Sequence, residues 1–390
     1  MWGSSMPTTS SAVMNEATGG KDGKSDTKPK DGIGICLSGG GYRAMLFHVG
    51  ALWRLNEVGL LARADRISSV SGGSITAGWL ALLWAKRGWG SSSIPQDDFR
   101  YHFAGGLRWL AAHLVDIPSI IRSFAPCHNV GQEVAQCYDR YLYQGATLQD
   151  LPDKPRFVFN SSNLQTGVLW RFSKPYMGDY KVGRIFTPNI RLAIAVAASS
   201  AFPPVLSPLE LELSPEQYTL DGTETLHRRP FTTRPLLCDG GVYDNLGMEP
   251  VFKEFKTVLV SDGGASFQEQ EEPSRFWPLQ LKRVLDCMDN QVGSLRKRDL
   301  MENYQSGQRE GAYWGIGTPL MRYPIPSGLS CSSETTMRLA RIKTRLAGMK
   351  STLQEELINW GYAACSASLA SYFPQQGVQP SWPYPQTPLG

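Results

Sequence analysis

The sequence of 390 residues lacks the cysteine and histidine patterns that cross-link a fold through disulfides or metal ions. Its seven cysteines are scattered without C-x-x-C pairs, and its five histidines do not cluster with them. Neither a disulfide framework nor a zinc site is therefore indicated, and reduced, intracellular thiols are expected. No cluster of Asp, Glu and His suggests a calcium site, so we expect no metal and no cofactor.

Long apolar runs and a strong charge imbalance are missing too. No stretch reaches the roughly 20 apolar residues of a transmembrane helix, and no apolar core follows a basic start as in a signal peptide. The formal net charge is +4 with 19% charged residues, which argues against nucleic acid as a partner. These absences favour a cytoplasmic protein, with peripheral membrane association left open. They give no indication of the oligomeric state.

Composition divides the chain into three parts. Residues 1–31 are rich in Ser, Thr, Gly, Lys and Asp without an apolar period, which predicts a disordered tail. Residues 32–372 form the expected domain, because a hydrophobic content of 42% over the whole chain suffices for a substantial core. Within this domain, residues 91–151 have a predominantly helical pattern. The Pro-rich residues 373–390 predict a mobile C-terminal tail.

The stretch 32–84 contains two strand-turn-helix units in succession. In the first unit, an apolar run is followed by the triplet Gly39, Gly40 and Gly41 and then by a helical pattern. Such a corner presents unpaired backbone NH groups and the positive end of a helix dipole, which suits a phosphate or a developing oxyanion. The corner matches neither G-x-x-x-x-G-K-[ST] nor G-x-G-x-x-G, so nothing here supports nucleotide binding.

The second unit places a serine at the tip of its turn. A short apolar strand runs into Ser71-Gly72-Gly73 and then into a helical pattern that is apolar nearly all round. A serine in this position, followed two residues later by glycine, is typical of a nucleophile elbow. Ser69 stands where the first glycine of G-x-S-x-G is usual, and it is also small. Taken alone, the unit fits equally well a serine that simply caps a buried helix.

A third stretch, 236–245, carries Asp239-Gly240-Gly241 after an apolar strand. In this order, SGGGYRA (38–44), SVSGG (69–73) and DGGVYDN (239–245) resemble the patatin-like phospholipase family, serine acyl hydrolases that use a Ser-Asp dyad. Stretches 159–167, 197–204 and, more weakly, 359–362 are similar to the same family. The resemblance therefore covers most of the chain, and the ordered trio is its most specific part.

The resemblance implies an α/β fold, with a central, mostly parallel sheet sandwiched by helices. It also implies roles for particular residues. Ser71 would be the nucleophile, Asp239 the base, and Gly39, Gly40 and Gly41 the oxyanion hole. The supporting residues would be Arg43, Gly73, Gly240 and Gly241.

The implied activity is hydrolysis of carboxylic ester bonds in phospholipids or lysophospholipids, at a lipid or membrane surface, through an acyl-serine. An acyltransferase, a thioesterase or a neutral-lipid lipase would use the same dyad. A non-enzymatic scaffold is disfavoured, because Ser71, Asp239 and the glycine triplet are all present. For residues 91–151, the apolar pattern fits helices packed on the sheet or a lid that guides acyl chains.

Asp262 competes with Asp239, because it also ends an apolar strand and precedes two glycines. We favour Asp239, since the residues after it match the family. No histidine follows Asp239, so the Ser, Asp, His order of α/β-hydrolases is unavailable and the aspartate must itself act as base, which needs a raised pKa. We expect His48 to be structural, and Arg43 either to tie down the glycine loop or to meet a phosphate.

Two helical patterns are expected near the C-terminus, at 276–304 and 334–362. On the second, Arg338, Arg341 and Arg345 recur at helical spacing beside an apolar stripe. These arginines fit a solvated face or, as the rarer alternative, a contact for anionic lipid headgroups. The run Arg296-Lys297-Arg298 allows the same two interpretations.

Overall fold

The computed structural model describes residues 28–90, 92–113, 130–375 and 378–390. Most of the predicted N-terminal tail and the part of the predicted lid between residues 114 and 129 lie outside these ranges. The tail was expected to end at residue 31, but the first strand already begins at Lys30. Among the helices within the described ranges, none combines the length and apolar character that crossing a bilayer would need.

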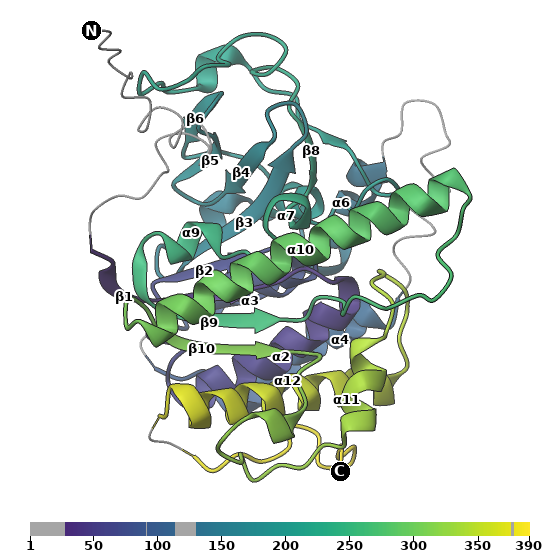
Figure 1. Cartoon of the computed structure of the whole chain (residues 1–390). Coiled ribbons are helices and arrows are strands. Elements are labelled where there is room, and N and C mark those ends of the chain that lie inside the picture. Colours follow the sequence, from purple (N-terminus) through teal and green to yellow (C-terminus); the bar gives the residue numbers. More distant parts are fainter. Residues whose placement is uncertain (1–27, 91, 114–129, 376–377) are drawn as a thin grey trace, which may run out of the picture.

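A ten-stranded sheet forms the centre of the fold (Figure 1). Five of its strands are parallel and lie side by side from one edge of the sheet, in the order β10 (Glu310–Gly315), β9 (Phe255–Asp262), β1 (Lys30–Leu37), β2 (Arg66–Ser69) and β3 (Arg156–Asn163). Antiparallel strands continue the sheet beyond β3 as β4 (Val168–Phe172), β5 (Tyr176–Asp179) and β6 (Gly183–Phe186). The predicted α/β fold with a central parallel sheet is confirmed.

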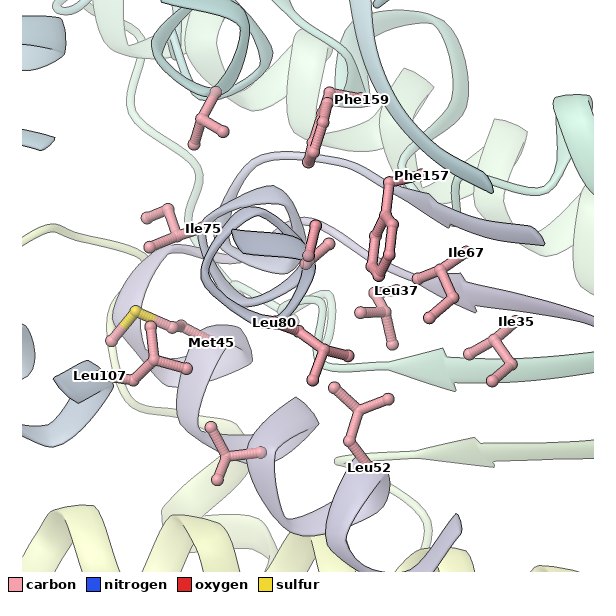
Figure 2. Packing of buried hydrophobic residues seen from close by; sticks show 14 of the residues in the cluster. Ile35, Leu37, Met45, Leu52, Ile67, Ile75, Leu80, Leu107, Phe157 and Phe159 are labelled. Atoms are coloured by element: carbon pink, nitrogen blue, oxygen red, sulfur yellow. The ribbon is translucent and has the colours of Figure 1, made fainter. Parts of the chain in front are cut away.

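Side-chain alternation along the central strands builds a core on each face of the sheet. On β1, Ile35 and Leu37 belong to the larger core, whereas Cys36 belongs to the smaller one on the opposite face. Three helices cover the larger core, α2 (Gly41–Glu57), α3 (Gly72–Arg87) and α12 (Ser351–Tyr372). Figure 2 shows Ile35, Leu37 and Ile67 of the sheet gathered with Leu52 of α2 and Leu80 of α3.

The opposite face carries α9 (Glu249–Phe252) and the C-terminal end of α10 (Trp277–Gln305). Leu300 of α10 packs there with Val258 and Val260 of β9. In Figure 1, α10 crosses this face of the sheet and its N-terminal half extends beyond the strands. The predicted sandwich of helices around the sheet is therefore present. The face covered by α2, α3 and α12 has the larger core, and the face covered by α9 and α10 has the smaller one.

Within the expected helical region 91–151, the described residues form short helices. They are η1 (Asp98–Ala104), α4 (Gly105–Ala111), α6 (Val130–Tyr138), η2 (Asp139–Tyr143) and η3 (Leu148–Asp150). Leu107 and Leu110 of the apolar pattern are buried in the larger core. These two residues thus pack on the domain, whereas Trp109 between them is 47% exposed, and the part of the pattern within residues 114–129 lies outside the described residues.

The expected helix over 334–362 is wrong, because two helices occupy this region. The first, α11 (Ser333–Ala340), is separated from α12 by a segment without helix. In that segment the carbonyl of Arg345 accepts a hydrogen bond of 3.1 Å from the amide of Tyr42 at the start of α2. Arg338 instead pairs with Glu356 at 2.9 Å. The three arginines therefore do not form one helical face.

The prediction of a mobile C-terminal tail is also wrong for residues 378–390. The side chain of Asn359 on α12 donates to the carbonyls of Tyr384 (2.9 Å) and Thr387 (2.8 Å) and accepts from the Tyr384 amide (3.0 Å). Tyr384 and Leu389 are buried in the larger core. Proline restricts this segment without preventing it from docking, because side-chain packing and backbone hydrogen bonds to α12 hold it.

Helices α2 and α12 cross with their backbones in contact, so we predict that no side chain larger than that of glycine fits at Gly361. A Cβ at Gly361 would lie 1.8 Å from the carbonyl oxygen of Phe47. We expect Gly361→Ala to lower the free energy of unfolding by about 1–3 kcal/mol, as overpacking does. Gly293→Ala on α10 is the control, since nothing lies within 4 Å of its Cβ position and alanine favours the helix by roughly 0.5–1 kcal/mol. Urea titration of both variants measures the effect, and equal stability would contradict it.

Candidate active site

Strands β2 and β8 (Leu236–Asp239) meet end to end beside β3, and this meeting builds the site. Strand β2 runs parallel to β3 and ends with Ser69 opposite Phe159. Strand β8 runs antiparallel to the following stretch of β3, residues 161–163, and ends with Asp239 opposite Ser161. The carboxyl ends of β2 and β8 therefore approach each other with one residue of β3, Asn160, between them. The turns that follow them, with Ser71 and Asp239, are brought together.

Ser71 occupies a strained turn between β2 and α3. Its φ of 52° and ψ of −120° are rare for a residue with a side chain. The two glycines that follow are needed for space, because a Cβ at Gly72 would lie 2.2 Å from the carbonyl oxygen of Gly41, and one at Gly73 would lie 2.4 Å from that of Leu37. The predicted elbow is present with Ser71 at its tip, and the same packing explains why small residues surround it.

Ser199, at the end of α7 (Leu192–Ser199), links the two turns. Its carbonyl oxygen accepts the amide of Ser71 at 3.1 Å and the amide of Gly240 at 3.2 Å. Its hydroxyl donates to the carbonyl of Asn160 on β3 at 2.6 Å. The sequence analysis named residues 197–204 only as a stretch similar to the family and did not assign this role to Ser199. The polar pair Ser199-Ser200, at the end of an otherwise apolar helix, was the available signal.

Asp239 is almost completely buried, with 3% of its surface exposed. Burial, with a smaller contribution from the charge of Asp289 on α10, raises its pKa to about 6 against the opposing effects of the Gly241 amide and the Ser71 hydroxyl. The Gly241 amide donates to Oδ1 at 2.7 Å, whereas Oδ2 is buried without a hydrogen bond of normal geometry. The Ser71 hydroxyl is near enough to this carboxyl group to lower its pKa.

The glycine loop lies directly against the serine turn. A Cβ at Gly39 would come within 3.1 Å of the Ser71 Cβ. The Gly39 amide already donates to the carbonyl of Asn245 at 3.0 Å, so of the three expected donors it is the one that is engaged. Gly40 and Gly41 stand at the N-terminus of α2, and their amides make no hydrogen bond to any residue in the described ranges. These two NH groups are free to meet an oxyanion.

Arg43 ties the glycine loop to the end of β9. Its guanidinium donates to the carbonyl of Gly263 from Nε (3.1 Å) and Nη2 (3.0 Å), and to the carbonyl of Ile342 from Nη1. Burial lowers its pKa to about 10, which leaves it charged at neutral pH. Of the two predicted roles, the contacts match loop anchoring, because each guanidinium nitrogen is used within the protein.

His48 is a structural residue in this fold, as expected. Its ring nitrogens contact the Ser261 hydroxyl at 2.7 Å and the Ser38 carbonyl at 2.9 Å. The carbonyl can only accept, so Nε2 carries the proton and Nδ1 accepts from Ser261. Burial lowers the pKa of His48 to about 4, which keeps it neutral. Its hydrogen bonds therefore fix the base of the glycine loop.

Asp262, the competing aspartate, is held by other groups. Burial by itself raises its pKa, but the charge of Lys297 and hydrogen bonds from Tyr313 and Gly264 outweigh burial and hold the pKa below its usual value. The Tyr313 hydroxyl donates at 2.7 Å and the Gly264 amide at 2.9 Å. Asp262 is thus an ionised anchor, whereas the structure brings Asp239 to Ser71.

Asn245 is a site residue that the sequence analysis named only as part of a motif. Its side-chain oxygen lies 2.3 Å from a Cβ position on Gly39 and 2.8 Å from one on Gly241. The amide group therefore fills the space between the glycine loop and the aspartate turn. Only glycine leaves room for it at these two positions, so the SGGG and DGG motifs are coupled through Asn245.

Neither the cavity at the β10 edge nor a group of metal ligands among the described residues identifies the candidate site. A cavity of about 640 Å³ lies along the β10 edge, between Tyr304 and Tyr323, and none of its lining residues belongs to the two turns. Within the described ranges, no group of three His, Cys, Asp or Glu side chains is placed to hold a metal ion. Backbone geometry and hydrogen bonding, rather than a hollow, single out Ser71 and Asp239.

Comparison with known proteins gives a family match. A family model for patatin-like phospholipase matches residues 35–252, more than half of the chain. This range contains the glycine loop, the serine turn and the aspartate turn. SPO1, a meiotic phospholipase candidate of Saccharomyces cerevisiae, is 50% identical over 65 residues, which are 17% of this chain and 10% of the yeast protein.

Solved structures with a similar fold include human GIVD cytosolic phospholipase A2. One structure of it matches with a TM-score of 0.50 and 14% identity, over 89% of this chain and 62% of the human chain. A second, in complex with methyl gamma-linolenyl fluorophosphonate, gives 0.48 and 16% identity, over 87% and 58%. This chain thus spans less than two thirds of the length of these relatives. At such identity, the likeness shows the fold alone.

The raised pKa of Asp239 predicts that its ionisation opposes folding. The unfolded carboxyl group ionises near pH 4 and the folded one near 6, so the penalty is absent below pH 4 and complete above about pH 7. We expect Asp239→Asn to raise the free energy of unfolding at pH 8 by about 1–3 kcal/mol, with the gain vanishing toward pH 4. Urea titrations at both pH values measure this difference.

Asp262→Asn is the matched control, because the pKa of Asp262 is lowered in the fold. Its ionisation stabilises the folded state, so this variant should lose stability at pH 8. If Asp239→Asn also lost stability at pH 8, this result would contradict the prediction that ionisation of Asp239 opposes folding.

Proposed function

The chain belongs to the patatin-like phospholipase family, and on that premise we propose that it is a serine hydrolase of carboxylic esters in phospholipids or lysophospholipids. One observation carries the proposal. A buried aspartate with a pKa raised to about 6 lies in a turn that the Ser199 carbonyl joins to the strained strand-to-helix turn of Ser71. The amides of Gly40 and Gly41, which make no hydrogen bond to any described residue, belong to the glycine loop that lies against the serine turn. These are a base, a nucleophile and an oxyanion site.

In the first half of the reaction, Ser71 Oγ attacks the ester carbonyl carbon and its proton passes to Asp239. The carbonyl oxygen gains a negative charge, and the NH groups of Gly40 and Gly41 would donate hydrogen bonds to it. One such donor contributes about 2.7–4 kcal/mol in comparable sites. The intermediate then collapses, the bond to the alcohol breaks, and Asp239 returns the proton to the departing alcohol oxygen. An acyl-serine remains.

In the second half, water replaces the alcohol. Asp239 takes a proton from the water as its oxygen attacks the acyl carbon, and the proton then returns to Ser71 Oγ as the acid leaves. A carboxylate with an ordinary pKa would be a weak base for either step. Burial supports this chemistry, because a pKa of about 6 keeps Asp239 ionised at neutral pH while strengthening it as a proton acceptor.

Ser199 and Asn245 act as positioning residues in this proposal. Ser199 fixes both turns to one carbonyl oxygen, so the distance between nucleophile and base depends on one atom. Asn245 keeps the glycine loop and the aspartate turn apart by the width of an amide. Neither residue is needed to transfer a proton.

We expect Ser71→Ala and Asp239→Asn each to lower turnover of a short-chain p-nitrophenyl ester and of labelled phosphatidylcholine by on the order of 10³-fold or more, because each removes a proton-transfer partner. Asp262→Asn, assayed under conditions where it remains folded, should keep most of the activity. Intact mass after fluorophosphonate treatment should show one adduct on the wild type and none on Ser71→Ala. Activity in Asp239→Asn together with its loss in Asp262→Asn would reverse the assignment of the base.

Product analysis decides between a hydrolase and an acyltransferase. With water as the only acceptor, free fatty acid should accumulate, and added alcohol or glycerolipid should not divert most of the acyl groups. Predominant transfer to the added acceptor would make this protein an acyltransferase on the same dyad.

The pH dependence of the reaction should follow Asp239. We expect kcat/KM for a soluble ester to fall tenfold per pH unit below about pH 6 and to level off above about pH 7, because only the ionised carboxylate accepts the proton. Asp289→Asn should move this acid limb to lower pH, since the charge of Asp289 raises the pKa of Asp239. An acid limb that does not move in Asp289→Asn, or that lies near pH 4, would contradict the proposed base.

A further inference from the structure

Helix α10 is attached to the domain through its C-terminal part. Arg296 contacts Asp244 at 3.5 Å and Glu249 at 3.3 Å, and Lys297 contacts Asp262 at 3.6 Å. Leu300 is the one residue of the 29-residue helix that is buried. The preceding turns of the helix, from Trp277 onward, are largely exposed and project past the sheet in Figure 1.

The exposed part of α10 carries an apolar face. Its large side chains recur at steps of three and four, each at least 42% exposed, which places them on one side of the helix. We call this set the α10 stripe: Trp277, Leu281, Val284, Leu285, Met288, Val292 and Leu295. A contiguous apolar face of this length is unusual on a free surface and marks a contact with another apolar phase.

We propose that the α10 stripe docks on an anionic phospholipid surface. Charge complementarity selects this occupant. Of the six Lys or Arg side chains in residues 275–298, Arg296 and Lys297 pair with acidic residues of the domain and Lys282 pairs with Asp286. Arg275, Arg283 and Arg298 make no ion pair with any described residue, so the segment keeps unpaired cations. A helix with an apolar stripe and a net positive charge binds in the plane of a bilayer interface, with its stripe among the acyl chains and its cations at the headgroups.

The stripe is also linked to the candidate active site. On the same helix, the charge of Asp289 acts on Asp239, and Arg296 donates to the carbonyl of Tyr243 at 3.2 Å, in the turn after Asp239. Val242 in that turn is exposed. Docking of the stripe would therefore bring a lipid surface next to the turn that carries the proposed base. The choice of lipid as occupant rests on the proposed function.

A second copy of this chain fits the stripe less well. Steps of three and four also occur in coiled coils, but pairing two copies would bring two net-positive segments together, and like charges oppose association. Lipid anions, in contrast, compensate those charges.

The experiment is flotation of the full-length protein with vesicles of phosphatidylcholine and phosphatidylserine at a 7:3 ratio. We expect the wild type to float and Leu281→Glu to bind about tenfold or more weakly, because one leucine leaves the acyl region and a negative charge enters it. Leu279→Glu is the matched control. Leu279 is equally exposed and lies two residues away, off the stripe, so this variant should bind nearly as the wild type does. High salt, or vesicles of phosphatidylcholine alone, should weaken wild-type binding.

Soluble-ester turnover separates the docking proposal from the proposed function. Both glutamate variants should turn over a short-chain ester at the wild-type rate, since neither residue touches the site, whereas Leu281→Glu should be slower on vesicle substrate. The inactive Ser71→Ala variant should still float. Flotation by a wild type that hydrolyses no ester would support docking and overturn the proposed function.

Two results would overturn the docking proposal. One is equal flotation of wild type and Leu281→Glu. The other is a dimer by light scattering that becomes monomeric in Leu281→Glu while vesicles bind neither form, which would make the stripe an interface between copies.

Discussion

The meeting of a buried carboxylate with a strained serine turn is the constraint on which the rest of this structure depends. Asp239 loses most of its hydration and Ser71 adopts a backbone conformation that side chains avoid. Both features are unfavourable for the isolated segments. They persist because β2 and β8 are fixed on the same strand, β3, and because one carbonyl oxygen, of Ser199, holds both turns. A raised pKa is the chemical consequence of this architecture.

The core around the site is held by close backbone contacts and buried hydrogen bonds. Helices α2 and α3 begin at the glycine loop and at the serine turn, and their first residues approach each other at backbone contact. Arg43 and His48, both on α2, join this loop to the ends of β1 and β9 through buried hydrogen bonds. Helix α12 then locks α2 in place through the close crossing at Gly361. The geometry of the candidate site and the stability of the fold thus depend on the same contacts.

Helix α10 connects this rigid centre with the molecular surface. Its C-terminal part is anchored by ion pairs to acidic residues beside the site, and its N-terminal part carries the exposed apolar stripe. One helix therefore exposes an apolar stripe at the molecular surface and also carries Asp289, whose charge raises the pKa of Asp239. In the proposed function, this arrangement would combine lipid docking and catalysis in a single unit.

The sequence by itself determined the elements and turns whose requirements are local. Glycine triplets, the Ser71 elbow and the Asp239 turn leave short-range signals, because strain and close backbone approach permit few residue types. Tertiary structure alone decided that Gly39 is already hydrogen-bonded, that Ser199 holds both turns, and that Arg345 and the C-terminal residues lie in segments that pack on the domain without forming helix. These features depend on strand register and on partners far away in the chain, and such long-range pairing leaves no periodic pattern in the sequence.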